Sequence, residues 1–190
     1  MNNYSLIGKL GACIALAALV SGCATPANPQ NMTLKAAEAT DIRQNSPEWT
    51  RSALAVKEVT GGKETNPAWT SQVSSDGFKA ALEESLKSVG MLADPLKAKY
   101  EVVAQLQKLD QPIFGASMTV TVTVSYQLVD RATRKTVAEK VLTTPYTAAW
   151  NAAFSGVERL RIANEGSVRE SVTAFIKHLQ SLKASDIAVR

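Results

Sequence analysis

The sequence predicts an α+β fold: a two-layer sandwich with a mostly antiparallel sheet and two helices on one face, in the order β-α-β-β-β-α. Three observations predict it. Apolar and hydroxyl side chains alternate strictly over residues 118–128, and apolar residues recur at helical spacing over residues 78–89 and 168–179. The alternation indicates a strand with one buried face, and the apolar stripes of two amphipathic helices can cover that face.

The first two elements follow from apolar spacing and from turn residues. Residues 53–59 are rich in apolar side chains and end at a pair of glycines, which is typical of a short strand. The first helix covers residues 78–89, with Ser74 or Ser75 as its N-cap and Gly90 as its stop.

The three remaining strands are predicted from side-chain alternation and from a polar turn. Partial alternation over residues 100–106 predicts the second strand. The long strand at 118–128 is followed by a polar stretch, residues 130–135, so we expect a hairpin whose returning strand starts at 136. Pro145 cannot donate a ladder hydrogen bond, which predicts an edge strand or a bulge there.

The closing helix is predicted around residues 168–179. It can begin as early as Arg159, although Gly166 weakens its first half by about 1 kcal/mol relative to alanine.

The N-terminus has the pattern of an export signal: one positive charge within residues 1–9, an apolar run over 10–20, and small residues before Cys23. The run is too short to cross a bilayer. Residues 20–23, Val-Ser-Gly-Cys, resemble the lipobox of bacterial lipoproteins, whose cysteine receives the lipid. Ala24 in the next position resembles lipoproteins passed on to the outer membrane. An ordinary signal peptide cleaved near Ala24 is the alternative.

This pattern divides the chain into three parts. Residues 1–22 are expected to be a lipoprotein signal peptide, and residues 23–50 a lipidated Cys23 with a flexible periplasmic tether. Residues 51–190 are expected to form the periplasmic α+β domain. The predicted location is the outer membrane, with the lipid-anchored protein facing the periplasm.

Several kinds of chemistry are disfavoured by composition. A formal charge of +4 is too mild to indicate a nucleic-acid partner. His178 is the single histidine, and no thiol would remain free after lipidation, so we expect no metal site, no cofactor and no Ser-His-Asp triad. Glu83, Glu84 and Asp110 could in principle supply a carboxylate pair for glycan cleavage, but glutamates on a helix surface are usually only solvated. We therefore expect no catalytic residues.

Two features are candidates for interaction. Arg131, Arg134 and Lys135 place positive charge at the hairpin tip, where they could meet anionic lipid headgroups or an acidic partner, or act only as a solubilising turn. Trp150 could anchor an interface or pack with Phe154 under the second helix.

The lipobox, the short first strand, the helix ending at Gly90, the long Thr/Val hairpin and the closing helix together resemble small envelope lipoproteins of the YajG type. They are similar, more distantly, to modules of assembly lipoproteins and of the TolB N-terminal region. The resemblance implies a non-catalytic module that binds an envelope protein, in an unknown oligomeric state. A carrier of a small hydrophobic or glycan ligand, with an apolar cavity between sheet and helices, is the alternative. A carboxylate-based enzyme is less favoured.

Overall fold

A computed structural model describes residues 24–188, and a four-stranded sheet lies at its centre. The strands are β1 (Leu54–Thr60), β2 (Tyr100–Asp110), β3 (Met118–Asp130) and β4 (Thr136–Ala148). They lie in the order β1-β2-β3-β4. β1 pairs with β2 in parallel, whereas the other two pairings are antiparallel. The mostly antiparallel α+β sheet is confirmed, and β4, which carries Pro145, is an edge strand as expected.

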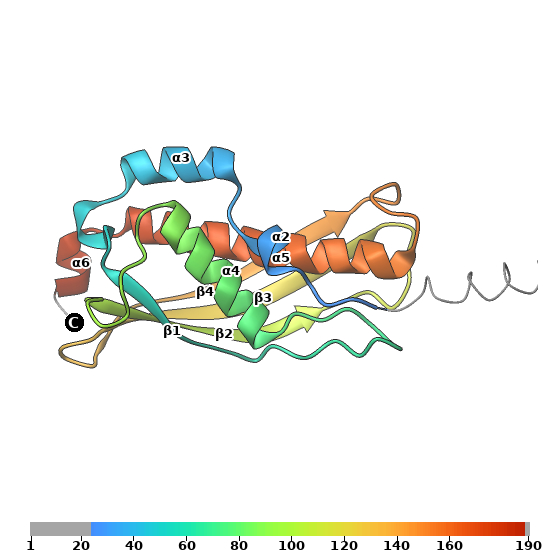
Figure 1. Ribbon diagram of the computed structural model, residues 1–190, viewed down its shortest axis with the longest axis horizontal. Helices are drawn as coiled ribbons and strands as arrows, with labels where there is room; N and C mark the ends of the chain where they lie inside the picture. Colours follow the sequence, from blue (N-terminus) through green and yellow to red (C-terminus); the bar gives the residue numbers. More distant parts are fainter. Residues whose placement is uncertain (1–23, 189–190) are drawn as a thin grey trace, which may run out of the picture.

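Two helices cover one face of this sheet, as Figure 1 shows. The helix α4 (Ser75–Ser88) packs on β1, and the long helix α5 (Gly156–Ser181) packs on β3 and β4. The Ser74 hydroxyl caps α4 by accepting the N–H of Gly77, and Gly90 has a left-handed φ of 75°, which favours glycine after a helix end. The predicted order β-α-β-β-β-α is confirmed.

Aromatic side chains fill the space between the sheet and the two helices. The ring of Tyr126 on β3 stacks on Phe175 of α5 at 4.2 Å between centroids and meets Phe78 of α4 edge-on at 6.4 Å. The Tyr126 hydroxyl pairs with Ser171 at 2.9 Å, while burial raises the pKa of this phenol far above its usual value. The position where the ligand-carrier alternative expects a cavity is therefore occupied by packed rings.

The segment between Ala24 and Thr50 is folded, so the expectation of a flexible tether is wrong for these residues. It contains α2 (Pro29–Met32), α3 (Ala36–Asn45) and the 3-10 helix η2 (Glu48–Thr50). Met32, Leu34 and Ile42 are buried in the core. In Figure 1, α3 lies beyond α4 and α5 on the side away from the sheet, and α2 contacts both of these helices. Burial against these helices outweighs the weak local pattern.

Two expectations lie at or beyond the ends of the described chain. These are the signal peptide and the lipidation of Cys23, which both fall outside the described residues. The described part of the chain ends with the short helix α6 (Ala184–Ala188). Among residues 24–188, no helix has both the length and the apolar character needed to span a membrane.

Candidate functional site at the apolar end of the domain

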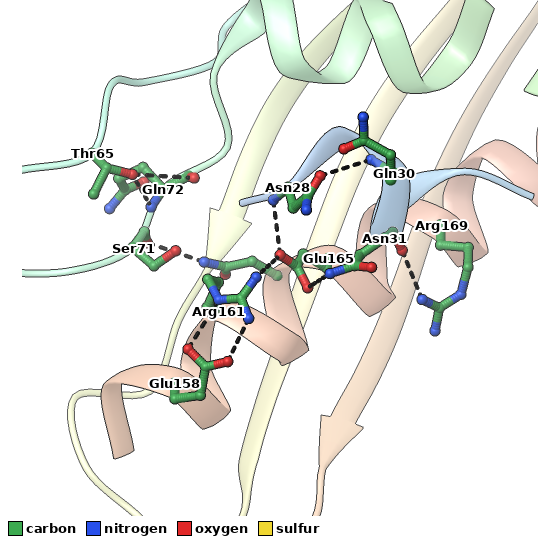
Figure 2. Close-up of polar contacts among 11 residues, drawn as sticks. Asn28, Gln30, Asn31, Thr65, Ser71, Gln72, Glu158, Arg161, Glu165 and Arg169 are labelled. Carbon is green, nitrogen blue, oxygen red and sulfur yellow. Dashed lines mark hydrogen bonds and ion pairs between the residues drawn. The ribbon is translucent and has the colours of Figure 1, made fainter. Parts of the chain in front are cut away.

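A buried carboxylate on α5 fixes the N-terminal segment to the domain. Glu165 accepts hydrogen bonds from the Asn28 backbone N–H at 2.8 Å and from the Asn31 side chain at 3.0 Å. It also pairs with Arg161, one helical turn away at 2.5 Å. Figure 2 shows the carboxylate at the centre of these contacts. We call Asn28, Asn31, Arg161 and Glu165 the N-terminal latch.

Neighbouring charges support the latch. Arg161 also donates to Glu158, and this hydrogen bond lowers the pKa of the Glu158 carboxyl and raises that of the guanidinium. Arg169 donates to the Asn31 carbonyl oxygen at 2.8 Å and lies over the Tyr146 ring. Together these contacts join α2 to α5.

The first described residues run beside the loop between β1 and α4. The N–H of Ala24 donates to the Pro67 carbonyl at 2.9 Å, and that of Ala27 donates to the Gln72 carbonyl at 3.1 Å. Ala24 is buried. The chain therefore enters the fold against this loop, and Cys23 is the residue immediately before that entry.

A second buried polar cluster holds this loop, the end of β2 and α5 together. Asn164 is completely buried; its side-chain carbonyl accepts from Gln111 at 2.8 Å, and its amide donates to the Ser71 carbonyl at 3.0 Å. Gln111 also donates to the Ser71 carbonyl, at 2.9 Å. Since buried amides are costly without partners, these bonds fix the relative positions of the three elements.

The loop between β4 and α5 is held in a similar way. The Arg159 guanidinium donates to the carbonyl oxygens of Ala153 at 2.8 Å and Phe154 at 3.1 Å, and Ser155 caps α5 through the N–H of Glu158. These bonds hold the backbone of the loop, and the Phe154 side chain is fully exposed.

Three loops thus gather large exposed apolar side chains at one end of the molecule. We call this set the apolar end: Trp69, Ile113, Phe114, Trp150 and Phe154. Ile113 and Phe114 are 95% and 85% exposed. In Figure 1 the loops that carry these residues lie at the right, at the end where the described chain begins. An open groove of about 770 Å³ runs between Trp69, the Ile113 loop and the start of α5.

The residues of the apolar end lie in three stretches of sequence that hold no charged residue, 65–75, 111–129 and 141–157, and the described chain begins with a fourth, 24–34. Charged residues make up 20% of the chain as a whole. This pattern is the sequence signal that could have identified the site, but the stretches are far apart in the chain and only the fold brings them together.

The predicted basic cluster lies at the opposite end. Arg131 and Arg134 both face Glu101, at 3.9 and 3.7 Å, and Arg131 also donates to the Pro95 carbonyl. Lys135 is exposed beside them. Figure 1 shows this β3–β4 turn at the left, away from the start of the described chain. The structure therefore groups the three basic residues but separates them from Trp150, which is exposed rather than packed under α5.

The sheet face opposite the helices is rich in hydroxyl groups. Thr119 pairs with Thr147 at 2.8 Å and Thr123 with Thr143 at 3.1 Å across β3 and β4. Figure 1 shows the described helices on the other side of the sheet. The same face continues to the free edge of β4, where Val141 is half exposed. We call this surface the hydroxyl face.

Two of the carboxylates considered for catalysis lie in exposed ion pairs on different elements. Glu84 pairs with Lys87, and Asp110 pairs with Lys108, both on the surface. No group of three or more His, Cys, Asp or Glu side chains within residues 24–188 is arranged to hold a metal ion.

His178, on α5, is expected to titrate below its usual pKa of 6.5, because partial burial and the charge of Lys140 both disfavour the imidazolium. Between the two values the unfolded chain binds more protons, so stability should rise with pH and fall as the solution is acidified. An NMR titration of this single histidine measures the shift. Lys140→Gln should move the pKa back upward, and an unchanged value would show that Lys140 has no influence.

Comparisons with known proteins support the fold. No family model matches the sequence, and no curated protein is significantly similar to it. Protein XCC0632 from Xanthomonas campestris, of family DUF330, is similar in structure with a TM-score of 0.52 at 10% identity, over 71% of this chain and 89% of that one. A minor lipoprotein from Acinetobacter baumannii matches at a TM-score of 0.45 and 12% identity, over 68% and 91%. The first likeness shows the fold alone, and the second is too weak for a conclusion. The YajG-type resemblance stays a prediction.

Proposed function

We propose that the chain is a lipid-anchored lipoprotein of the outer membrane that faces the periplasm and acts as a non-catalytic protein-binding or assembly module. The observation that carries the binding role is the hydroxyl face, which continues to the free edge of β4. The lipobox at residues 20–23 supports the anchor, because it places a cysteine directly before the folded domain.

The β4 edge is suited to pairing with a strand of another protein. β4 is bonded to β3 on one side only, so backbone donors and acceptors remain on the other. Glu139 and Lys140 protect one half of the edge, and Pro145 removes one donor from the other half. The stretch between them, residues 141–144, is uncharged, and an extended segment of a partner could add to the sheet there.

The anchor is tested by Cys23→Ser. We expect the parent chain to float with outer-membrane vesicles in a density gradient, and its N-terminal peptide to carry acyl chains by mass spectrometry. The variant should lack both the acylated peptide and the cleavage before residue 23. If the parent peptide carries no acyl chain, the lipid anchor is wrong.

The binding role is tested by photocrosslinking in intact cells. A photoreactive residue replaces Thr143 on the hydroxyl face or, as a matched control, the exposed Glu84 on α4. We expect a discrete envelope protein to be recovered from position 143 and not from 84. Identical bystander proteins from both positions would exclude the hydroxyl face as the binding surface.

A further inference from the structure

We propose that the apolar end seats in the lipid bilayer beside the acyl chains of Cys23, so that the domain sits directly on the membrane. This inference rests on the lipid anchor of the proposed function. It assigns a bilayer-facing surface to side chains that the protein-binding role does not use.

The first argument is the place where the chain enters the fold. Ala24 is buried and bonded to Pro67, in the loop whose turn carries Trp69. Cys23 directly precedes Ala24 in the sequence, and the Cα atoms of consecutive residues are about 3.8 Å apart. A flexible coil over residues 24–50 would let the domain stand roughly 30 Å away from the bilayer surface. The folded segment removes this freedom, so acyl chains on Cys23 must enter the bilayer close to Trp69.

The second argument is the chemistry of the surface. The apolar end exposes aromatic and branched side chains on three separate loops. Large apolar side chains exposed together at one end of a domain mark an interaction site, and tryptophan prefers the boundary between headgroups and acyl chains. Four uncharged stretches converge here, whereas the opposite end carries Arg131, Arg134 and Lys135. None of the five side chains of the apolar end therefore has a charged neighbour in sequence, and the exposed Lys108–Asp110 pair at the end of β2 is placed to remain among the headgroups.

The third argument is that the loops are already held in the exposed arrangement. The Trp69 N–H donates to the Asn66 carbonyl at 3.0 Å in a tight turn, and Arg159 bonds the carbonyls beneath Phe154. Gln111, one residue before the Pro-Ile-Phe turn, is bonded to the buried Asn164. Because these backbones are fixed by polar contacts, seating in lipid needs little further ordering of the chain.

The test places a fluorescent label on a single introduced cysteine of the full, lipidated chain. Ile113→Cys puts the label at the apolar end. The matched control is Leu96→Cys, an apolar position that is also largely exposed, at 83%, next to Pro95 at the opposite end. Cys13 leaves with the signal peptide, and an acylated Cys23 cannot react. The labelled proteins are reconstituted in phosphatidylethanolamine and phosphatidylglycerol vesicles, with or without nitroxide-labelled phospholipid.

We expect the nitroxide lipid to quench the label at residue 113, with a blue shift of its emission, and to leave the label at residue 96 unchanged. If neither label is quenched in a chain that floats with the vesicles, the inference is wrong while the anchor stands. A blue shift at 113 in vesicles without quenching by the nitroxide lipid indicates a second copy or a protein partner at this end, and also overturns the inference. If the parent chain reacts with the thiol label at Cys23, the anchor of the proposed function has failed, and this inference with it.

Discussion

Replacing Glu165 with alanine is expected to lower the free energy of unfolding by about 3 kcal/mol, the cost typical of removing one partner from a buried ion pair. The change leaves the Asn28 N–H, the Asn31 amide and Arg161 without their shared acceptor. The effect falls at the lower end of the usual range because Arg161 keeps its bonds to Glu158. Chemical denaturation monitored by circular dichroism measures it.

Amide hydrogen exchange shows where the loss occurs. The latch holds residues 24–34 on α5, so we expect protection to fall first at Ala27 and Asn28 while the strands stay protected. Glu165→Gln keeps an acceptor oxygen in a side chain of the same shape, so it should lower the free energy of unfolding less than Glu165→Ala does. Glu158→Ala, which removes the more exposed partner of Arg161, is the matched control. Equal stability of the two alanine variants would show that the latch does not hold the segment.

Glu165→Ala also distinguishes a domain that is held directly on the membrane from one that is joined to its anchor by a flexible segment. If the proposed anchor and membrane seating hold, the intact latch keeps both at one end of the molecule and gives the domain one orientation on the membrane. With residues 24–34 released, the segment becomes the flexible connection that its composition alone suggests, and the label at residue 113 should lose part of its quenching by nitroxide lipid while the chain stays membrane-bound.

The core of the fold could be predicted because its signals are local. The alternation over β3, the Ser74 cap and Gly90 each determine structure through neighbours in sequence. The folded state of residues 24–50 could not be predicted, because it depends on distant partners. Met32 and Ile42 are isolated apolar residues in a polar stretch, and only the packed helices α4 and α5 supply the surface that buries them.

The candidate site divides in the same way. The basic hairpin was visible because Arg131, Arg134 and Lys135 are neighbours in sequence, although its ion pairs with Glu101 depend on strand pairing. The apolar end combines Trp69, Ile113 and Phe154 from three loops, and no local pattern relates them. Each stretch shows in the sequence that it holds no charged residue. Only the fold shows that these stretches come together at the end where the described chain begins.

The second large effect is expected at Gly166. Helix propensity predicts that alanine at this position stabilises the domain, whereas the packing in the fold predicts that it destabilises the domain. Alanine in the middle of an exposed helix should stabilise it by about 1 kcal/mol over glycine. In α5, however, a Cβ at residue 166 would lie 2.2 Å from Cδ1 and 2.3 Å from Cγ of Tyr146 on β4. The ring must leave its place or β4 must shift, so we expect Gly166→Ala to destabilise the domain by about 2 kcal/mol in denaturant unfolding.

A double-mutant cycle with Tyr146→Ala assigns the cause. Without the ring, the three atoms that lie nearest to the methyl group added at position 166 are gone and the helix preference remains, so in that background Gly166→Ala should stabilise by up to about 1 kcal/mol. The same close approach lets Arg169 lie over the ring while it donates to the Asn31 carbonyl, so displacement of Tyr146 should also reduce protection of α2. If Gly166→Ala stabilises the parent chain, the close packing of α5 on β4 is wrong, and the glycine serves no purpose that this fold explains.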